Sequence, residues 1–148
     1  MDDARGAKGA AILLLGGVAI THLADLPHKL MEARYMAVLF IFLIVASLVL
    51  SLLISSNWRP ELVWPATGLI CGLTVVGYVV SRVVPLPGMA DHVGDWLNVA
   101  GILALACELE LISIAVERFQ AVRPAPLVRQ YVSRARASSP SKRFEASA

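Results

Sequence analysis

Residues 35–55 have the sequence YMAVLFIFLIVASLVLSLLIS, which contains no charged side chain. A helix that crosses the roughly 30 Å hydrocarbon core of a bilayer needs about 20 predominantly apolar residues. This run is long enough and apolar enough to do so, and it therefore predicts a transmembrane helix. The rest of the chain is best interpreted with lipid, rather than water, as its solvent.

Three further apolar windows of similar length flank this run on both sides. We therefore expect four spans, at residues 9–26, 35–54, 62–86 and 96–116. The segments between them carry proline, glycine and charged residues and are short enough to join antiparallel neighbours. The predicted fold class is an all-α membrane protein, a four-transmembrane-helix bundle formed by residues 1–117.

The composition supports a membrane protein and gives no sign of an enzyme. Of the 148 residues, 57% are hydrophobic and only 16% are charged, whereas about a quarter are charged in soluble domains. Cys71 and Cys107 both lie inside predicted spans, which indicates small buried side chains rather than a disulfide framework. Since the chain has no nucleophile triad, phosphate-binding loop, dinucleotide fingerprint or C-x-x-C motif, we expect no catalytic activity.

The distribution of basic residues predicts the orientation. Of the 13 Lys and Arg residues, ten fall on the side that holds both termini and the loop around Arg59, and three fall on the other. Cytoplasmic segments are enriched in basic residues, so we expect a multi-pass protein of the cell (inner or plasma) membrane with both termini in the cytoplasm.

Residues 118–148 form a basic, partly disordered tail that would lie on anionic lipid through Arg129, Arg134 and Arg136. Because topology already explains this charge, we expect no nucleic-acid partner.

Histidines gather where the first span is predicted to leave the membrane and where the fourth enters it. His22 and Asp25 have H-x-x-D spacing, and so do His92 and Asp95. On a helix, residues three apart share one face. Two imidazoles and two carboxylates suit zinc or copper, so these four residues are a candidate metal site, to which two neighbours could contribute: His28 and Asp91.

Ordinary structural roles account for most of the same pattern. Asp91 or Asp95 could cap the fourth helix, and Asp25 could pair with Lys29. Histidines are also tolerated in the wet interfacial layer. A separate alternative is a haem-binding site in which two histidines ligate the iron. We expect Pro27 to end the first helix. The sequence does not identify a cofactor.

Two acids lie inside the fourth predicted span. An intramembrane carboxylate is costly and therefore marks a candidate functional residue. We expect Glu108 to face the bundle and Glu110 to reach toward the cytoplasmic interface. Glu108 would hold helices together by hydrogen bonding, transfer a proton or cation, or contact a partner subunit. The glycines of the first and third spans favour close packing of these two spans at the centre of the bundle.

Three features in the membrane part carry a resemblance. They are the histidine-containing end of the first span, the segment GYVVSRVVPLPG followed by DHVGDWLNVAG, and the acid at Glu108. With these, the chain resembles a loosely defined group of small bacterial four-span membrane proteins without an assigned function. Members of that group often have Ser-Arg-Thr-x-Gly-Leu-Pro, where residues 81–87 of this chain are SRVVPLP. The resemblance implies a four-span fold and brings no catalytic residues.

Two functions are compatible with these features. The first is a structural or accessory subunit of a larger membrane complex, bound to other membrane subunits or to itself, because the chain is nearly all span and Glu108 has no basic residue at its own depth. The alternative is extracytoplasmic binding of a metal ion, or metal or proton transport, through the His/Asp site and the intramembrane glutamate.

Overall fold

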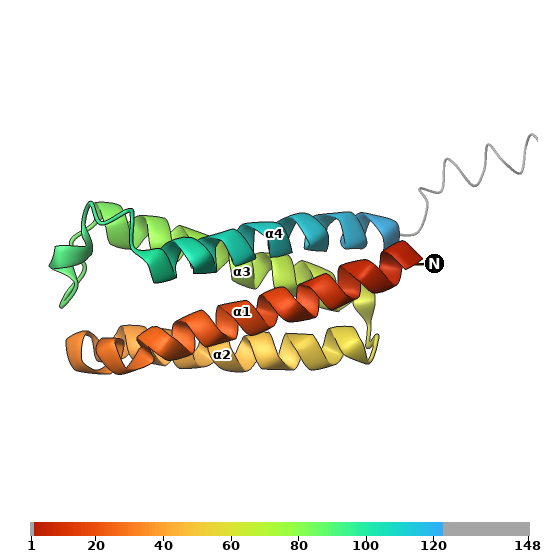
Figure 1. Ribbon diagram of the computed structural model, residues 1–148, viewed down its shortest axis with the longest axis horizontal. Coiled ribbons are helices and arrows are strands. Elements are labelled where there is room, and N and C mark those ends of the chain that lie inside the picture. Colours follow the sequence, from red (N-terminus) through yellow and green to blue (C-terminus); the bar gives the residue numbers. More distant parts are fainter. Residues whose placement is uncertain (1, 123–148) are drawn as a thin grey trace, which may run out of the picture.

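The computed structural model describes residues 2–122, which form four long helices joined by short connections (Figure 1). The helices are α1 (Asp2–Glu32), α2 (Arg34–Ser55), α3 (Pro60–Val83) and α4 (Val99–Val122), and a short 3-10 turn, η1 (Ala90–His92), lies between α3 and α4. Each of the four long helices is long and apolar enough to cross a membrane, and no strand occurs among the described residues. The predicted all-helical class with four candidate spans is therefore confirmed. The tail residues Arg129, Arg134 and Arg136 lie outside the described part of the chain.

Local chemistry explains where α3 and α4 begin. Pro60 is the first residue of α3, where its missing N–H costs no helical hydrogen bond, and the preceding Arg59 has a left-handed backbone. The fourth helix begins at Val99 rather than at the predicted residue 96, because the side chain of Asn98 caps it. The Asn98 Oδ1 atom accepts a hydrogen bond from the Gly101 N–H at 3.0 Å.

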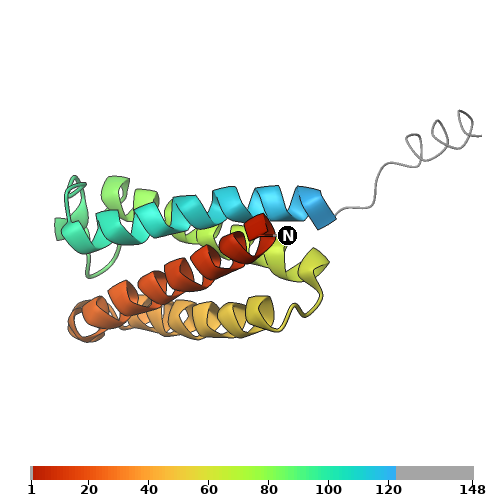
Figure 2. The same ribbon diagram turned by 45° about the vertical axis from the view of Figure 1, so that its right-hand side comes forward.

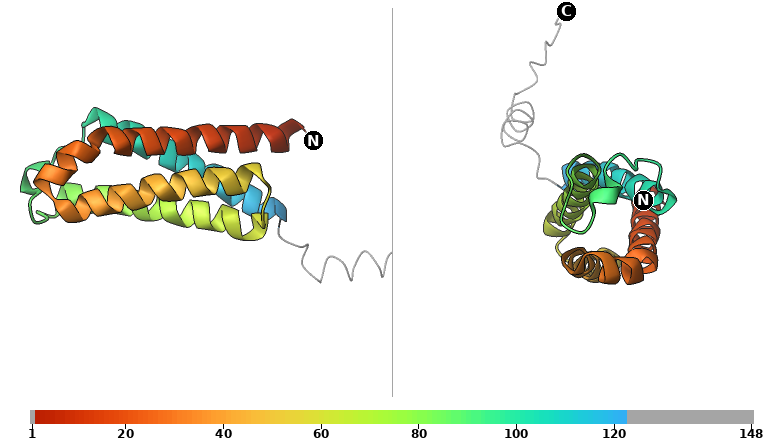
Figure 3. Two further views of the ribbon diagram at one scale, coloured as in Figure 1. Left: turned by 90° about the horizontal axis from the view of Figure 1, so that it is seen from below. Right: turned by 90° about the vertical axis from the view of Figure 1, so that its left-hand side faces the viewer.

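The first helix is longer than the sequence predicts. Pro27 was expected to end it, but this expectation is wrong, because α1 continues to Glu32 with Pro27 inside it. Proline removes its own N–H from the helical ladder and its ring crowds the carbonyl one turn earlier, but the turns after it are held because Lys29 bonds both Glu32 and His92. These last turns bend away from the line of the rest of α1 (Figure 3). At 1.5 Å per residue α1 is about 46 Å long, which exceeds the ~30 Å hydrocarbon core.

The helices pack as two antiparallel hairpins. The α1–α2 hairpin and the α3–α4 hairpin join mainly through α1 and α4, whereas α2 and α3 make few contacts. Figures 1 and 2 show the two hairpins close together near the N-terminus and spread apart at the opposite end. We call that opposite end, formed by residues 28–34 and 84–98, the histidine end. A continuous buried apolar cluster holds the bundle together and includes Leu15, Ile54, Trp64, Leu111 and Ala115.

Two glycines, Gly17 of α1 and Gly68 of α3, approach α4 closely. A Cβ atom added at Gly17 would lie 3.2 Å from Cys107 Sγ, and a Cβ atom added at Gly68 would lie 3.4 Å from Ala115 Cβ. Both neighbours belong to α4. Short loops place each helix beside its chain neighbour and leave α1 and α3 diagonal to each other, so these two spans each pack against α4 rather than against one another.

Candidate functional site

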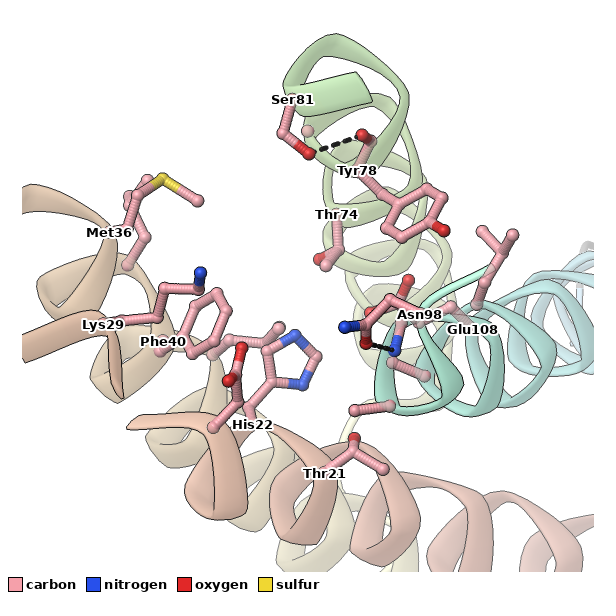
Figure 4. A pocket seen from close by; sticks show the side chains of 18 of the residues that line it. Thr21, His22, Lys29, Met36, Phe40, Thr74, Tyr78, Ser81, Asn98 and Glu108 are labelled. Atoms are coloured by element: carbon pink, nitrogen blue, oxygen red, sulfur yellow. Dashed lines mark hydrogen bonds between the residues drawn. The ribbon is translucent and has the colours of Figure 1, made fainter. Parts of the chain in front are cut away.

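A cavity of about 370 Å³ lies between the two hairpins, toward the histidine end, and receives side chains from all four long helices (Figure 4). Its volume falls in the range of roughly 300–1,000 Å³ that small-molecule sites occupy. Apolar and aromatic side chains form most of its wall. Polar side chains line the remainder, among them Thr21, His22, Asp25, Lys29, Tyr78, Arg82, His92, Asn98 and Glu108.

Glu108 is the acid that lines this cavity from α4. It belongs to the buried face of the helix, which also includes Ala104, Leu111 and Ala115 at helical spacing. Only 1% of Glu108 is exposed, and its Oε1 atom has no hydrogen-bond partner among the described residues. At 1.5 Å per residue it lies about 14 Å along α4 from Val99. The cavity therefore contains a buried acceptor that the described residues leave unused.

Arg82, in the last turn of α3, is the buried cation of the cavity. Its guanidinium Cζ lies 4.7 Å from the centre of the Tyr78 ring, in cation–π geometry. Its Nη1 atom approaches the carbonyl oxygen of His92 at 3.4 Å, and the Arg82 carbonyl accepts a hydrogen bond from the Gly94 N–H at 2.9 Å. The Nε atom is buried and has no partner among residues 2–122. Arg82 and Glu108 thus both line the cavity, and each has one buried polar atom, a donor and an acceptor respectively, that the described residues leave unused.

His22 contributes an imidazole from α1. Its Nδ1 atom lies 2.8 Å from the Val18 carbonyl oxygen, so Nδ1 carries a proton and donates it to that carbonyl. The ring meets the Phe40 ring edge to face, with centroids 4.7 Å apart. In Figure 4 the imidazole projects between the α1–α2 side and the α3–α4 side of the cavity.

Lys29, Glu32 and His92 form a polar contact that joins the two hairpins at the histidine end; we call it the Lys29 bridge. The Lys29 Nζ atom lies 2.7 Å from Glu32 Oε2 and 2.8 Å from His92 Nε2. An ammonium group has only donors, so Nε2 must be the acceptor and the His92 proton sits on Nδ1. The 3.1 Å approach of Nε2 to Glu32 Oε2 then carries no hydrogen bond of its own. Only 4% of Lys29 is exposed, so Glu32 supplies the charge that this buried ammonium needs.

The residues of the predicted metal site are partly brought together. His22, Asp25, His28 and His92 all line the cavity, whereas Asp91 and Asp95 are exposed. His92 ends η1 and Asp95 lies after it, so the two do not share a face of an α-helix, as H-x-x-D spacing suggested. Within residues 2–122, no group of three or more His, Cys, Asp or Glu residues is arranged to hold a metal ion. Zinc or copper binding stays a prediction.

Other residues that matter here were not singled out by sequence reasoning as parts of a site. A pairing of Lys29 with Asp25 was one alternative, but Lys29 pairs with Glu32. Asn98, not Asp91 or Asp95, caps α4, and an Asn directly before the apolar run that begins at Val99 was the available signal. Arg82 could not be assigned from sequence, because its burial depends on how the segment after α3 folds back over it.

Glu110 lies on the opposite side of α4 from Glu108 and is exposed. Ser113 and Glu117, three and seven residues later, are exposed as well and continue the same helix face. In a candidate membrane span, such a face would meet lipid or another protein.

Comparison with models of protein families, with curated proteins and with solved structures finds no match for this chain. The cavity and its two unused polar atoms, one acceptor and one donor, are therefore the strongest basis for proposing a function.

Proposed function

We propose that this chain is a non-enzymatic integral membrane protein that binds a small molecule in the cavity at the histidine end, with Glu108 as the residue that anchors it. The observation that carries the proposal is the Glu108 Oε1 atom, which is buried and lacks a partner among the described residues. An unsatisfied buried acceptor costs about 1–3 kcal/mol, and more when it is charged. A ligand with a donor group would remove that cost.

The cavity supports the same proposal by its size and composition. A volume of about 370 Å³ holds a molecule rather than a single ion, and the wall is mostly apolar with a few convergent polar groups. This combination is typical of small-molecule sites, which lie between the helices of bundles among other places.

The membrane orientation is part of the proposal. The excess of basic residues at the end opposite the histidine end, including Arg5, Lys8 and Arg59, supports cytoplasmic termini. The cavity would then open toward the extracytoplasmic side of the cell membrane.

The test compares two glutamates on one helix. We expect wild-type protein, extracted in native-lipid discs, to release a stoichiometric small molecule when it is denatured, as measured by mass spectrometry. Glu108→Leu removes the buried acceptor and should lower the retained amount by about tenfold or more. Glu110→Leu is the matched control: it makes the same change on the exposed face of α4 and should leave retention unchanged.

Two results would contradict the proposal. One is a wild-type protein that releases nothing, and the other is equal retention in the Glu108 and Glu110 variants. The same samples are also analysed for zinc and copper. A stoichiometric metal that disappears in a His22→Ala, His92→Ala double variant would favour the metal-binding alternative instead.

A second candidate function, an accessory subunit of a membrane complex, is supported by the exposed face of α4. Glu110, Ser113 and Glu117 present polar groups where a span that faced only lipid would be apolar. A partner helix with a basic or hydrogen-bond-donating side chain at matching depth would satisfy them. Such interhelical polar contacts are common in membrane bundles.

For this second function we expect a partner chain to be purified together with the wild-type protein. Replacing both Glu110 and Glu117 with Leu should reduce the co-purified partner by about fivefold or more, since the helix then offers no acceptor to it. Glu108→Leu should leave the partner bound. If the partner remains with the Glu110→Leu, Glu117→Leu variant, or if none is found, this face of α4 is only a lipid contact.

A further inference from the structure

We infer that the ligand of the cavity is a neutral, lipid-soluble molecule with a hydroxyl group, and that it enters from the bilayer between α2 and α3. This inference rests on the proposed function and narrows the chemical class of the ligand and its route.

The route follows from side chains that face the cavity and the outside at once. Leu39 and Phe42 on α2 and Leu73 on α3 line the cavity, yet 55%, 63% and 63% of these residues are exposed. A side chain does both only where the cavity wall reaches the surface of the molecule. The α2 and α3 helices are joined by residues 56–59 and make few contacts beyond that region, and the two hairpins diverge toward the histidine end (Figures 1 and 3). The wall between α2 and α3 is therefore a side opening.

The depth of this opening places it in lipid. Leu39 and Phe42 lie about 8 and 12 Å along α2 from Arg34, and Leu73 lies about 15 Å along α3 from Val83. One leaflet contributes about half of the roughly 30 Å hydrocarbon core. The opening therefore faces acyl chains at the depth of one leaflet, so molecules that dissolve in the bilayer reach it directly.

The unpartnered polar atoms in the cavity wall define the functional group of the ligand. Glu108 Oε1 needs a donor and Arg82 Nε needs an acceptor, and both side chains are more than nine-tenths buried. Arg82 Nη2 lies 3.5 Å from the Cβ position at Gly101, and Gly101 is about 10 Å from Glu108 along α4. A hydroxyl group donates to the first site, and a hydroxyl or carbonyl oxygen accepts from the second.

Charge and shape favour a neutral molecule. Two cationic residues, Lys29 and Arg82, and two acidic residues, Asp25 and Glu108, line the cavity, so its wall has no excess of formal charge for a charged ligand to neutralise. A charged amine or an anion would also have to cross the acyl chains. The aromatic rings of Phe40, Phe42 and Tyr78 supply apolar surface for a ring or a chain. A long-chain alcohol or a lipid-soluble phenol meets the requirement at Glu108, and a second hydroxyl or a carbonyl oxygen about 10 Å from its hydroxyl group would meet the requirement at Arg82.

The experiment uses three diazirine photoprobes with the full chain in lipid nanodiscs. The first is a long-chain alcohol, the second is its methyl ether, which lacks the donor, and the third is a short water-soluble alcohol. We expect the long-chain alcohol to label peptides of the cavity, with labelling lost in excess unlabelled alcohol. Labelling by the methyl ether or by the short alcohol should be weaker by about tenfold.

Matched tryptophan variants test the route. Leu73→Trp places a bulky ring at the side opening and should reduce labelling by the long-chain alcohol by about fivefold or more. Leu69→Trp makes the same change one turn away on α3, at a residue that is 64% exposed and does not line the cavity, and should have no effect. Both residues are exposed, and the unfolding midpoint of each variant establishes that it folds.

The outcomes separate the inference from the proposed function. If Glu108→Leu abolishes cavity labelling by the short alcohol while Leu73→Trp changes nothing, the cavity binds a ligand that arrives from water, and the lipid route is wrong. If the methyl ether labels the cavity as strongly as the alcohol, the hydroxyl assignment is wrong. If no probe labels the cavity in wild-type protein, the inference is overturned, while a small molecule released from native-lipid discs would still support the proposed function.

Discussion

Replacing Gly88 with alanine is expected to lower the free energy of unfolding by about 3 kcal/mol, combining the strain of a left-handed residue with a steric clash. Gly88 has φ +76°, where a Cβ atom alone costs about 1–2 kcal/mol. A Cβ at this position would also lie 2.7 Å from the carbonyl oxygen of Glu32. That oxygen belongs to the backbone, so it can move away only if the end of α1 moves with it.

The contact matters because it is one of the places where the two hairpins meet at the histidine end. Beside it, the Tyr35 hydroxyl donates a hydrogen bond to the Pro87 carbonyl at 2.9 Å. Pushing the segment around Gly88 away from Glu32 would strain this bond and the Lys29 bridge together. The loss should therefore appear as cooperative destabilisation rather than as local fraying.

The control for Gly88→Ala is Gly94→Ala. The free energies of unfolding of both variants are measured by equilibrium unfolding in one detergent. Gly94 has φ +82°, but a Cβ there would meet no atom within 4 Å. The Gly94→Ala variant introduces only backbone strain, so we expect its free energy of unfolding to fall by about 1 kcal/mol. Equal losses at the two positions would show that the approach of Gly88 to Glu32 contributes nothing to stability.

The four helices could be predicted from the sequence because length and apolarity are local properties. The run at residues 35–55 is enough to specify α2, and Pro60 places the start of α3. The burial of Glu108 likewise follows from its helical spacing with Leu111 and Ala115. These features need no knowledge of distant contacts.

The end of α1 and the cavity could not be predicted in the same way. Pro27 is locally a helix breaker, and only the contact of Lys29 with His92, 63 residues away, explains why the helix continues. The cavity depends on the divergence of two hairpins, which no single segment encodes. The H-x-x-D spacing at His92 was misleading because a 3-10 turn and a loop precede α4 there.

The Lys29 bridge should be the second most sensitive part of the structure. Glu32→Gln is expected to lower the free energy of unfolding by about 2–3 kcal/mol, because it leaves a buried ammonium without its anionic partner. The value lies below the range for fully buried pairs because Glu32 is partly exposed and water screens it. The exposed acid Glu61, in the first turn of α3, is the matched control, and Glu61→Gln should change stability by less than about 0.5 kcal/mol.

A double-mutant cycle shows whether the lost stability comes from the pair. Lys29→Met replaces the ammonium with an apolar side chain of similar length, so adding Glu32→Gln to it should cost much less than Glu32→Gln costs alone. Equilibrium unfolding of the four proteins gives the coupling free energy, and a coupling near zero would mean that Lys29 is satisfied without Glu32. Because the bridge joins the hairpins beside the cavity, the Glu32→Gln variant should also retain less ligand, whereas the Glu61→Gln variant should retain as much as wild type.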